Sequence, residues 1–179
     1  MKFFIFIWFL WFVLELVISQ TKLSKKSKNQ EEKSAKNILL IAVIFGLTLG
    51  VVLMYDVDLP ISDKQIIPYT GLLLIVLGMF LRVLAAINLR KSTGNAVKTN
   101  GTYKLIRHPA YLANLISFAG VGLCFNNILS FFVILVPIYI AFLHKIRIEE
   151  KILTEEHGDE YVDYMKKTKK LIPFIFFNI

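Results

Sequence analysis

The chain has 179 residues, of which 56% are hydrophobic and 19% charged, and its mean hydropathy is +0.61. A soluble domain is nearer half apolar and a quarter charged. This composition excludes a disordered chain, and the single cysteine excludes a disulfide scaffold and a cysteine-ligated zinc module. The net charge of +8 would suit nucleic acid only on a soluble basic face. Because the apolar residues form long uncharged runs with the basic residues between them, the sequence predicts a multi-pass membrane protein.

Uncharged runs predict an all-α bundle of five membrane helices. Residues 38–55 contain no charge and, as a helix, are long enough to cross most of a hydrocarbon core of about 30 Å. A second run, 3–19, is broken only by Glu15. It could be a signal peptide, but no Ala-x-Ala-like cleavage site follows, so we favour a retained helix. A third helix is expected over 66–89, with Pro68 in its first turn, where the missing N–H is tolerated.

The longest uncharged run, 109–143, contains 35 residues and is too long for one span. Because Asn126-Asn127 divides it, we expect a tight antiparallel hairpin of two helices. The first of these carries a face of small residues that a neighbouring helix could approach closely: Ala113, Ser117, Gly120 and Cys124. The tail at 145–170 has the pattern of an amphipathic helix with a break at Gly158, and the apolar residues after it suit the membrane interface.

The basic residues indicate an orientation. Of the 21 Lys and Arg residues, 18 lie between the first and second predicted helices, between the third and fourth, or after Leu143. The loop between the second and third helices instead holds three aspartates and one lysine. By the positive-inside rule, the N-terminus is expected outside and the C-terminus in the cytoplasm.

One polar cluster, residues 100–111, precedes and opens the hairpin. Gly101 permits a turn, and Pro109 suits the first position of a helix, so Arg107 and His108 should lie beside that helix's unpaired N–H groups. An anion or carboxylate would be stabilised there. The alternative is an interfacial arginine anchor with a capping imidazole. A lone histidine supports no metal site.

A second cluster continues from the fifth predicted helix. Lys145 and Glu149 are four residues apart and should share a helix face, while Arg147 lies three residues before Glu150. An ordinary ladder of charges on a solvated helix is one reading. In the functional reading, the glutamates face a cationic ligand and the basic residues an anionic one. Arg82, inside the third helix, is given a structural role, with Glu15 as a conceivable partner.

Together the two clusters resemble the isoprenylcysteine carboxyl methyltransferase family and its prokaryotic relatives, with the phospholipid methyltransferases as cousins. The matching motifs are Gly101-Thr-Tyr103, Arg107-His-Pro-Ala-Tyr111, Glu149-Glu-Lys-Ile-Leu153, Gly158-Asp-Glu-Tyr161-Val-Asp-Tyr164 and Ile172-Pro173. The resemblance covers about residues 78–173, roughly half of the chain. It implies methyl transfer from S-adenosyl-L-methionine at the cytoplasmic membrane face.

The resemblance also implies the site. The implied cofactor-binding residues are Asn95, Ala96, Val97, Lys98, Tyr103, His108, Pro109, Ala110, Tyr111 and Glu149. The implied catalytic residues are Lys145, Arg147, Glu149 and Glu150, and no metal is expected. Lys145 departs from the family's arginine, Asn95 from a frequent histidine and Ala113 from a common glycine. The acceptor therefore stays open among a prenylated cysteine carboxylate, a phospholipid amine and a small thiol.

A single domain, 1–179, is expected, with two helices in 1–65 and a catalytic part, 66–173, that contains the hairpin and the tail helix. The expected partners are the lipid bilayer and a lipophilic or prenylated acceptor, with no nucleic acid and no obligate protein partner.

Two other classes of function stay open. An NADPH-dependent reductase of the sterol type also carries Arg-His-Pro, but typically with Trp at the position of Tyr103 and Asn at that of Ala110. A non-enzymatic membrane scaffold would bind no cofactor.

Overall fold

The computed structural model describes residues 30–62, 66–91, 97, 99 and 101–171. Within these residues the helices are α2 (Gln30–Asp56), α3 (Ile66–Lys91), the 3-10 turn η1 (Gly101–Lys104), α4 (Pro109–Cys124), α5 (Ile128–His157) and α6 (Asp159–Lys167). The all-α prediction is confirmed for this part of the chain, as are the start of α3, the hairpin and the break at Gly158. The first predicted helix, 3–19, lies outside the described residues.

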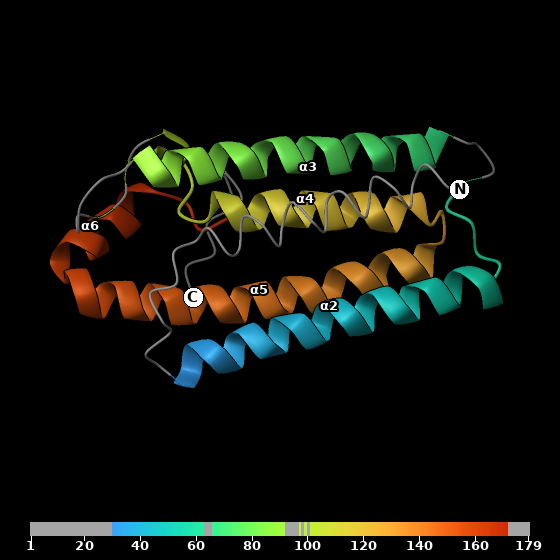
Figure 1. The fold of residues 1–179 in the computed structure, drawn as a ribbon, viewed down its shortest axis with the longest axis horizontal. Coiled ribbons are helices and arrows are strands. Elements are labelled where there is room, and N and C mark those ends of the chain that lie inside the picture. Colours follow the sequence, from blue (N-terminus) through green and yellow to red (C-terminus); the bar gives the residue numbers. More distant parts are fainter. Residues whose placement is uncertain (1–29, 63–65, 92–96, 98, 100, 172–179) are drawn as a thin grey trace.

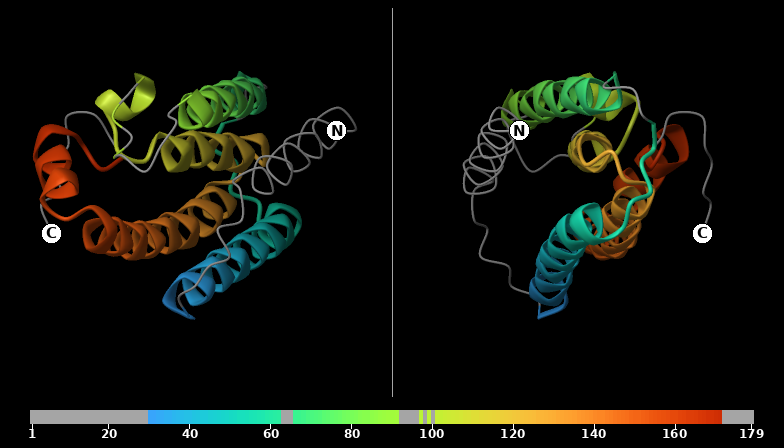
Figure 2. Two further views of the ribbon diagram at one scale, coloured as in Figure 1. Left: turned by 60° about the vertical axis from the view of Figure 1, so that its left-hand side comes forward. Right: turned by 90° about the vertical axis from the view of Figure 1, so that its right-hand side faces the viewer.

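The helices form two pairs (Figure 1). α3 runs along α4, and α2 runs along α5, while α4 also packs against α5 and so joins the pairs. η1, the start of α4, the end of α5 and α6 gather at one end of the bundle, as Figure 2 shows from two further directions. Because the two predicted polar clusters precede α4 and end α5, the antiparallel hairpin brings them to this same end.

Three helices in the described part are long and apolar enough to cross a membrane: α2, α3 from Ile66 to Leu89, and α5. Large apolar side chains such as Leu40, Leu73 and Ile140 point outward and are exposed. Such a surface is stable only against lipid. The chain is therefore a multi-pass membrane protein. α4 is apolar but shorter, with 16 residues, so three of the four expected spans that lie within the described residues are long enough to cross a membrane.

Small residues allow α3 and α4 to lie close together. A Cβ atom on Gly71 would lie 2.5 Å from the Gly120 carbonyl oxygen, and one on Gly120 would lie equally close to the Gly71 oxygen. Farther along, a Cβ on Gly78 would lie 2.7 Å from the carbonyl oxygen of Ala113. The predicted small-residue face of α4 is thus confirmed as a helix contact. Cys124 belongs to it, with its thiol directed at the Pro68 carbonyl.

Asn127 and Ser130 join the hairpin turn to α2 and its C-terminal end. Asn126 adopts a positive φ of 49°, and Asn127 caps α5 by accepting a hydrogen bond from the Ser130 N–H at 3.0 Å. The Asn127 amide also donates to the Val57 carbonyl at 2.6 Å, while the Ser130 hydroxyl donates to the Gly50 carbonyl at 2.8 Å. The turn therefore satisfies carbonyl groups of α2 and its C-terminal end as well as its own helix.

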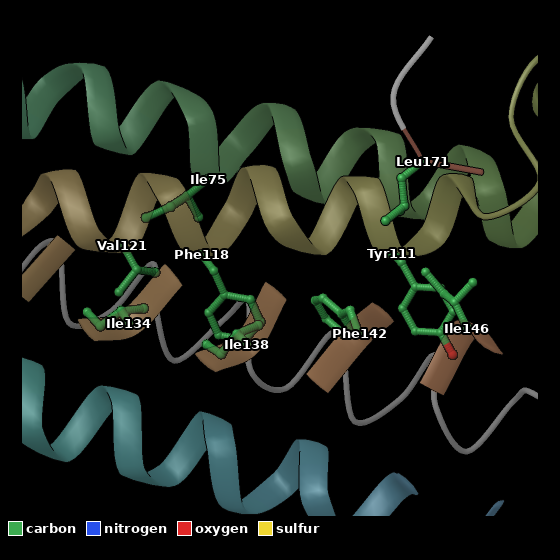
Figure 3. Packing of buried hydrophobic residues seen from close by; sticks show 9 residues of the cluster. All are labelled: Ile75, Tyr111, Phe118, Val121, Ile134, Ile138, Phe142, Ile146 and Leu171. Atoms are coloured by element: carbon green, nitrogen blue, oxygen red, sulfur yellow. The ribbon is translucent and has the colours of Figure 1, made fainter. Parts of the chain in front are cut away.

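The hydrophobic core lies mainly between α4 and α5 (Figure 3). Along it, Phe118 and Tyr111 of α4 alternate with side chains of α5. The Phe142 ring packs between them, 5.1 Å from the Tyr111 centroid and 6.5 Å from that of Phe118. Leu171, from the chain after α6, closes the row beside Tyr111. The core thus extends to the end of the bundle that holds the polar clusters and fixes the Tyr111 ring there.

Candidate active site

Pro109 opens α4, as predicted, and His108 is the residue that precedes it. The His108 side chain is 6% exposed and makes no capping hydrogen bond to the helix. Its Nε2 atom lies 3.2 Å from Oε1 of Glu150 instead. The Arg107 guanidinium donates to the same oxygen at 2.8 Å and is only 10% exposed. The alternative of an interfacial arginine with a capping imidazole is therefore wrong, because both side chains turn inward to α5.

On α5, the predicted shared face of Lys145 and Glu149 is confirmed. The Lys145 ammonium lies 3.9 Å from Oε1 of Glu149 and 5.5 Å from the centre of the Tyr111 ring. The Tyr111 hydroxyl donates to the same carboxylate oxygen at 2.5 Å. The Glu149 side chain remains 25% exposed. It is thus held in one orientation by α4 and by the preceding turn of α5, with a face open to a ligand.

Glu150 points in another direction, because consecutive residues of an α-helix are rotated by about 100°. Its carboxylate oxygens meet three basic side chains, those of Arg107, His108 and Lys170. The Glu150 side chain is 12% exposed. The two adjacent glutamates therefore have different surroundings.

A cavity of about 230 Å³ lies among η1, α4, α5 and α6. Its lining residues are Leu89, Val97, Tyr103, Arg107, His108, Ala110, Tyr111, Glu149, Leu153, His157, Tyr161 and Tyr164. Glu149, Leu153 and His157 are spaced by four residues and form one face of α5. The cavity thus combines a carboxylate, a guanidinium and two imidazoles with four tyrosine rings and several apolar side chains.

The tyrosines of the cavity outside the membrane helices are neutral hydroxyl groups. Burial raises the pKa of Tyr103 to about 12, although the positive charge of Arg82 acts in the opposite direction. Burial likewise raises the pKa of Tyr164 to about 12. The Tyr164 hydroxyl donates to the Tyr103 carbonyl at 2.6 Å. Arg82 itself is buried in α3, and Glu15, its suggested partner, lies outside the described residues.

The structure brings together most of the described residues that were predicted to bind the cofactor. Those that line the cavity are Val97, Tyr103, His108, Ala110, Tyr111 and Glu149. Pro109 is buried among them without lining the cavity. Asn95, Ala96 and Lys98 lie outside the described residues.

The four predicted catalytic residues divide into separate groups. Glu149 lines the cavity, and the Lys145 ammonium contacts the Glu149 carboxylate. Glu150 instead meets Arg107, while Arg147 is exposed, and neither lines the cavity.

The site prediction did not include half of the cavity wall. The residues it missed are Leu89, Arg107, Leu153, His157, Tyr161 and Tyr164. A signal existed for three of them, because Arg107 belongs to the polar cluster before α4, and Leu153 and His157 lie four and eight residues after Glu149 on a continuous helix. The two tyrosines belong to a motif that was recognised but given no role. Their contribution depends on how α6 folds back, which no local pattern specifies.

Residues 66–160 match the family profile described as phospholipid methyltransferase. A chain of Oryza sativa subsp. indica, described as a probable protein-S-isoprenylcysteine O-methyltransferase, is 29% identical over 125 residues, or 64% of this chain and 65% of that protein. The protein-S-isoprenylcysteine O-methyltransferase of Saccharomyces cerevisiae is 34% identical over 115 residues, or 59% of this chain and 48% of that protein. That of Mus musculus is 29% identical over 116 residues, or 59% and 41%.

The matched part spans between about two fifths and two thirds of the length of these relatives. The family match extends from the start of α3 into α6 and contains every described cavity-lining residue except Tyr161 and Tyr164. Because this match covers more than half of the chain, the protein belongs to the phospholipid methyltransferase family, and isoprenylcysteine O-methyltransferases are its distant relatives.

Proposed function

We propose that this protein is an integral membrane methyltransferase that uses S-adenosyl-L-methionine and acts on a lipid-like or prenylcysteine-type carboxylate. The proposal rests chiefly on the cavity at the end of the hairpin. The partly buried Glu149 carboxylate lines this cavity, and the Lys145 ammonium, which does not line the cavity, lies 3.9 Å from that carboxylate, all within the region that matches the family. Such a pair can receive a cationic methyl donor and an anionic acceptor at neighbouring positions.

The residues of the cavity suit this cofactor. Its sulfonium and ammonium groups are cations, for which the Glu149 carboxylate is a charge-assisted partner. The tyrosine rings of the cavity offer flat apolar surfaces on which a purine can pack. We assign cofactor binding to the lining residues Val97, Tyr103, His108, Ala110, Tyr111 and Glu149, with Asn95, Ala96, Lys98 and Pro109 as predicted neighbours. When bound, the cofactor supplies a methyl group on positively charged sulfur.

The chain contributes chiefly positioning and electrostatics, as an in-line displacement requires. The hydrogen bond from Tyr111 and the ion pair with Lys145 hold the Glu149 carboxylate in one orientation. The Lys145 ammonium in turn attracts a carboxylate acceptor. A carboxylate oxygen is already a nucleophile, so this reaction needs no general base. Arg147 stays a predicted acceptor contact on the outer face of the same helix.

Transfer of radiolabelled methyl groups tests the function. The full chain in lipid nanodiscs should transfer tritium from methyl-labelled S-adenosyl-L-methionine to N-acetyl-S-farnesylcysteine. The product should release labelled methanol in base, because esters hydrolyse whereas methylamines and thioethers do not. Nanodiscs without the protein and N-acetylcysteine without the lipid chain are the controls. Absence of transfer together with binding of NADPH would refute the proposal in favour of a reductase.

We also propose that five helices of one domain, 1–179, span the membrane with the N-terminus outside and the site at the cytoplasmic face. Support comes from the predominance of basic residues in three segments, two of which border the site end of the bundle. The end of α2 at Asp56 and the start of the following loop, with Asp58, belong to the opposite end.

Thiol labelling in a Cys124→Ser background tests the orientation. Asp58→Cys and Glu156→Cys place single thiols at exposed positions separated by α3, α4 and α5. A membrane-impermeant maleimide should label the thiol at position 58 in intact cells, and that at 156 only after permeabilisation. The reverse pattern would contradict the orientation. Labelling of both from outside would contradict the three crossings between them.

A further inference from the structure

We infer that Arg107 and Glu150 are positioning residues that latch α6 over the cavity and so set how long a ligand stays bound. The latch consists of these two side chains and the segment 168–171 that follows α6. The inference rests on the proposed function in one respect, since the ligand considered is the cofactor or its product. The latch itself is a property of the ligand-free chain.

The Arg107 guanidinium connects three parts of the fold. Its Nε atom donates to the Glu150 carboxylate of α5 at 2.8 Å. Its Nη1 atom donates to the carbonyl oxygens of Met165 and Thr168 at 2.7 and 3.0 Å, at the C-terminal end of α6. The last carbonyl groups of a helix have no partners within the helix. Arg107 therefore caps α6 from outside and ties it to α5 and to the start of α4.

The backbone after α6 strengthens this connection. The Arg107 N–H donates to the Lys169 carbonyl at 2.7 Å, and the Lys169 N–H donates to the Leu105 carbonyl at 3.2 Å. The His108 N–H donates to the Lys170 carbonyl at 3.2 Å. This short parallel pairing lies directly beside the guanidinium. Loss of the Arg107 side chain would thus leave three backbone hydrogen bonds and the ion pair between Lys170 and Glu150 to hold the segment.

The part of the molecule that the latch holds is one wall of the cavity. α6 has nine residues and buries only Tyr161 and Tyr164, and both of these line the cavity. It begins after Gly158, which has φ 56° and no neighbouring atom within 4 Å of a Cβ position. Since α6 packs through so few side chains, its detachment depends largely on the latch.

This arrangement accounts for Glu150, which does not line the cavity but meets three basic side chains. Besides Arg107, it contacts His108 at 3.2 Å and Lys170 at 3.3 Å. His108 lines the cavity and Lys170 belongs to the latched segment. Glu150 therefore acts through its neighbours, by orienting an imidazole of the site and by anchoring α6 at two points.

Hydrogen exchange of the ligand-free protein in nanodiscs tests the latch without reference to activity. In Arg107→Gln and Glu150→Gln, we expect amides of α6 and 168–171 to exchange about tenfold to a hundredfold faster, as loss of charge-assisted hydrogen bonds implies. Arg107→Lys should give an intermediate rate, because an ammonium lacks the planar fork. Lys151→Gln is the matched control, since it removes an ion pair between α5 and Glu31 whose side chains are more than half exposed.

The second measurement is the dissociation rate of S-adenosylhomocysteine. It should rise by a similar factor in Arg107→Gln and Glu150→Gln and stay at the wild-type value in Lys151→Gln. Unchanged exchange of α6 in both latch variants would overturn the inference, whatever the ligand does. Faster exchange with an unchanged dissociation rate would overturn the positioning role. If the wild type binds no S-adenosylhomocysteine, the proposed function fails, while faster exchange would still support the latch. Should Arg107→Gln not fold, Glu150→Gln and Arg107→Lys decide the result.

Discussion

Glu149→Gln is expected to weaken binding of sinefungin, a cofactor analogue with an ammonium in place of the methylsulfonium, by about tenfold to a hundredfold. The substitution keeps the shape of the side chain and removes its charge. A charge-assisted hydrogen bond contributes about 1.5–3 kcal/mol, which corresponds to one to two decades in affinity. Titration calorimetry of the purified chain in detergent measures the effect.

Comparing the affinity loss for sinefungin with that for S-adenosylhomocysteine shows which group of the cofactor Glu149 contacts. This ligand has a neutral sulfur but keeps the amino-acid ammonium, so an equal loss for both ligands would place Glu149 beside the ammonium. A loss confined to sinefungin would place Glu149 beside the reacting sulfur. Glu156→Gln, at an exposed position of the same helix, is the matched control. Wild-type affinity for both ligands in Glu149→Gln would remove Glu149 from the cofactor site.

Lys145→Ala separates the role of the Lys145 ammonium from that of the Glu149 carboxylate. The Lys145 ammonium contacts the carboxylate at 3.9 Å and competes with a cationic ligand for it. Its removal should therefore leave sinefungin affinity at or above the wild-type value, whereas turnover of a carboxylate acceptor should fall.

Gly71→Leu is expected to lower stability by about 3 kcal/mol or more, at the upper end of the range for overpacking. Helix propensity alone predicts the opposite, because leucine is favoured over glycine in a helix by about 1 kcal/mol. The close contact with α4 decides whether the substitution raises or lowers the stability. A Cβ at position 71 would lie 2.5 Å from the Gly120 carbonyl oxygen and 2.8 Å from the Cys124 nitrogen. Both are backbone atoms of a helix and cannot rotate away, so α3 and α4 would have to separate.

Thermal unfolding in detergent, followed by circular dichroism, measures this change. Thr70→Leu is the matched control, because it introduces the same side chain at the adjacent exposed position of α3. The control should keep the wild-type midpoint, whereas Gly71→Leu should lower it. A midpoint that is unchanged or raised in Gly71→Leu would show that α3 and α4 do not approach this closely.

The sequence by itself determined several ends of the described helices. It was wrong about the start of α2, because the charge-free run begins at residue 38 whereas the helix already begins at Gln30 and includes the charged residues before that run. Pro109 favours a helix start, Asn126-Asn127 a turn, and Gly158 a break, and the structure has each of them at that place. These signals act through backbone dihedral angles and missing or competing hydrogen bonds, so they need no distant partner. The motifs also predicted that Glu149 and Tyr111 lie near each other, and the two side chains are in contact, since a helical hairpin returns its second arm to the start of the first.

The family resemblance assigned the cofactor to Glu149 rather than to Glu150, but only the tertiary structure decided what surrounds each of these adjacent glutamates. Helical geometry requires that Glu149 and Glu150 point in different directions, but it does not specify which residues lie in each direction. The loop before α4 and the segment after α6 surround Glu150 with Arg107 and Lys170, whereas Tyr111 meets Glu149. Such pairings form between segments more than 15 residues apart, and they depend on the packing of α4 against α5 and on the fold-back of α6. Local periodicity carries no information about either, so the cavity wall and its latch emerge only from the assembled helices.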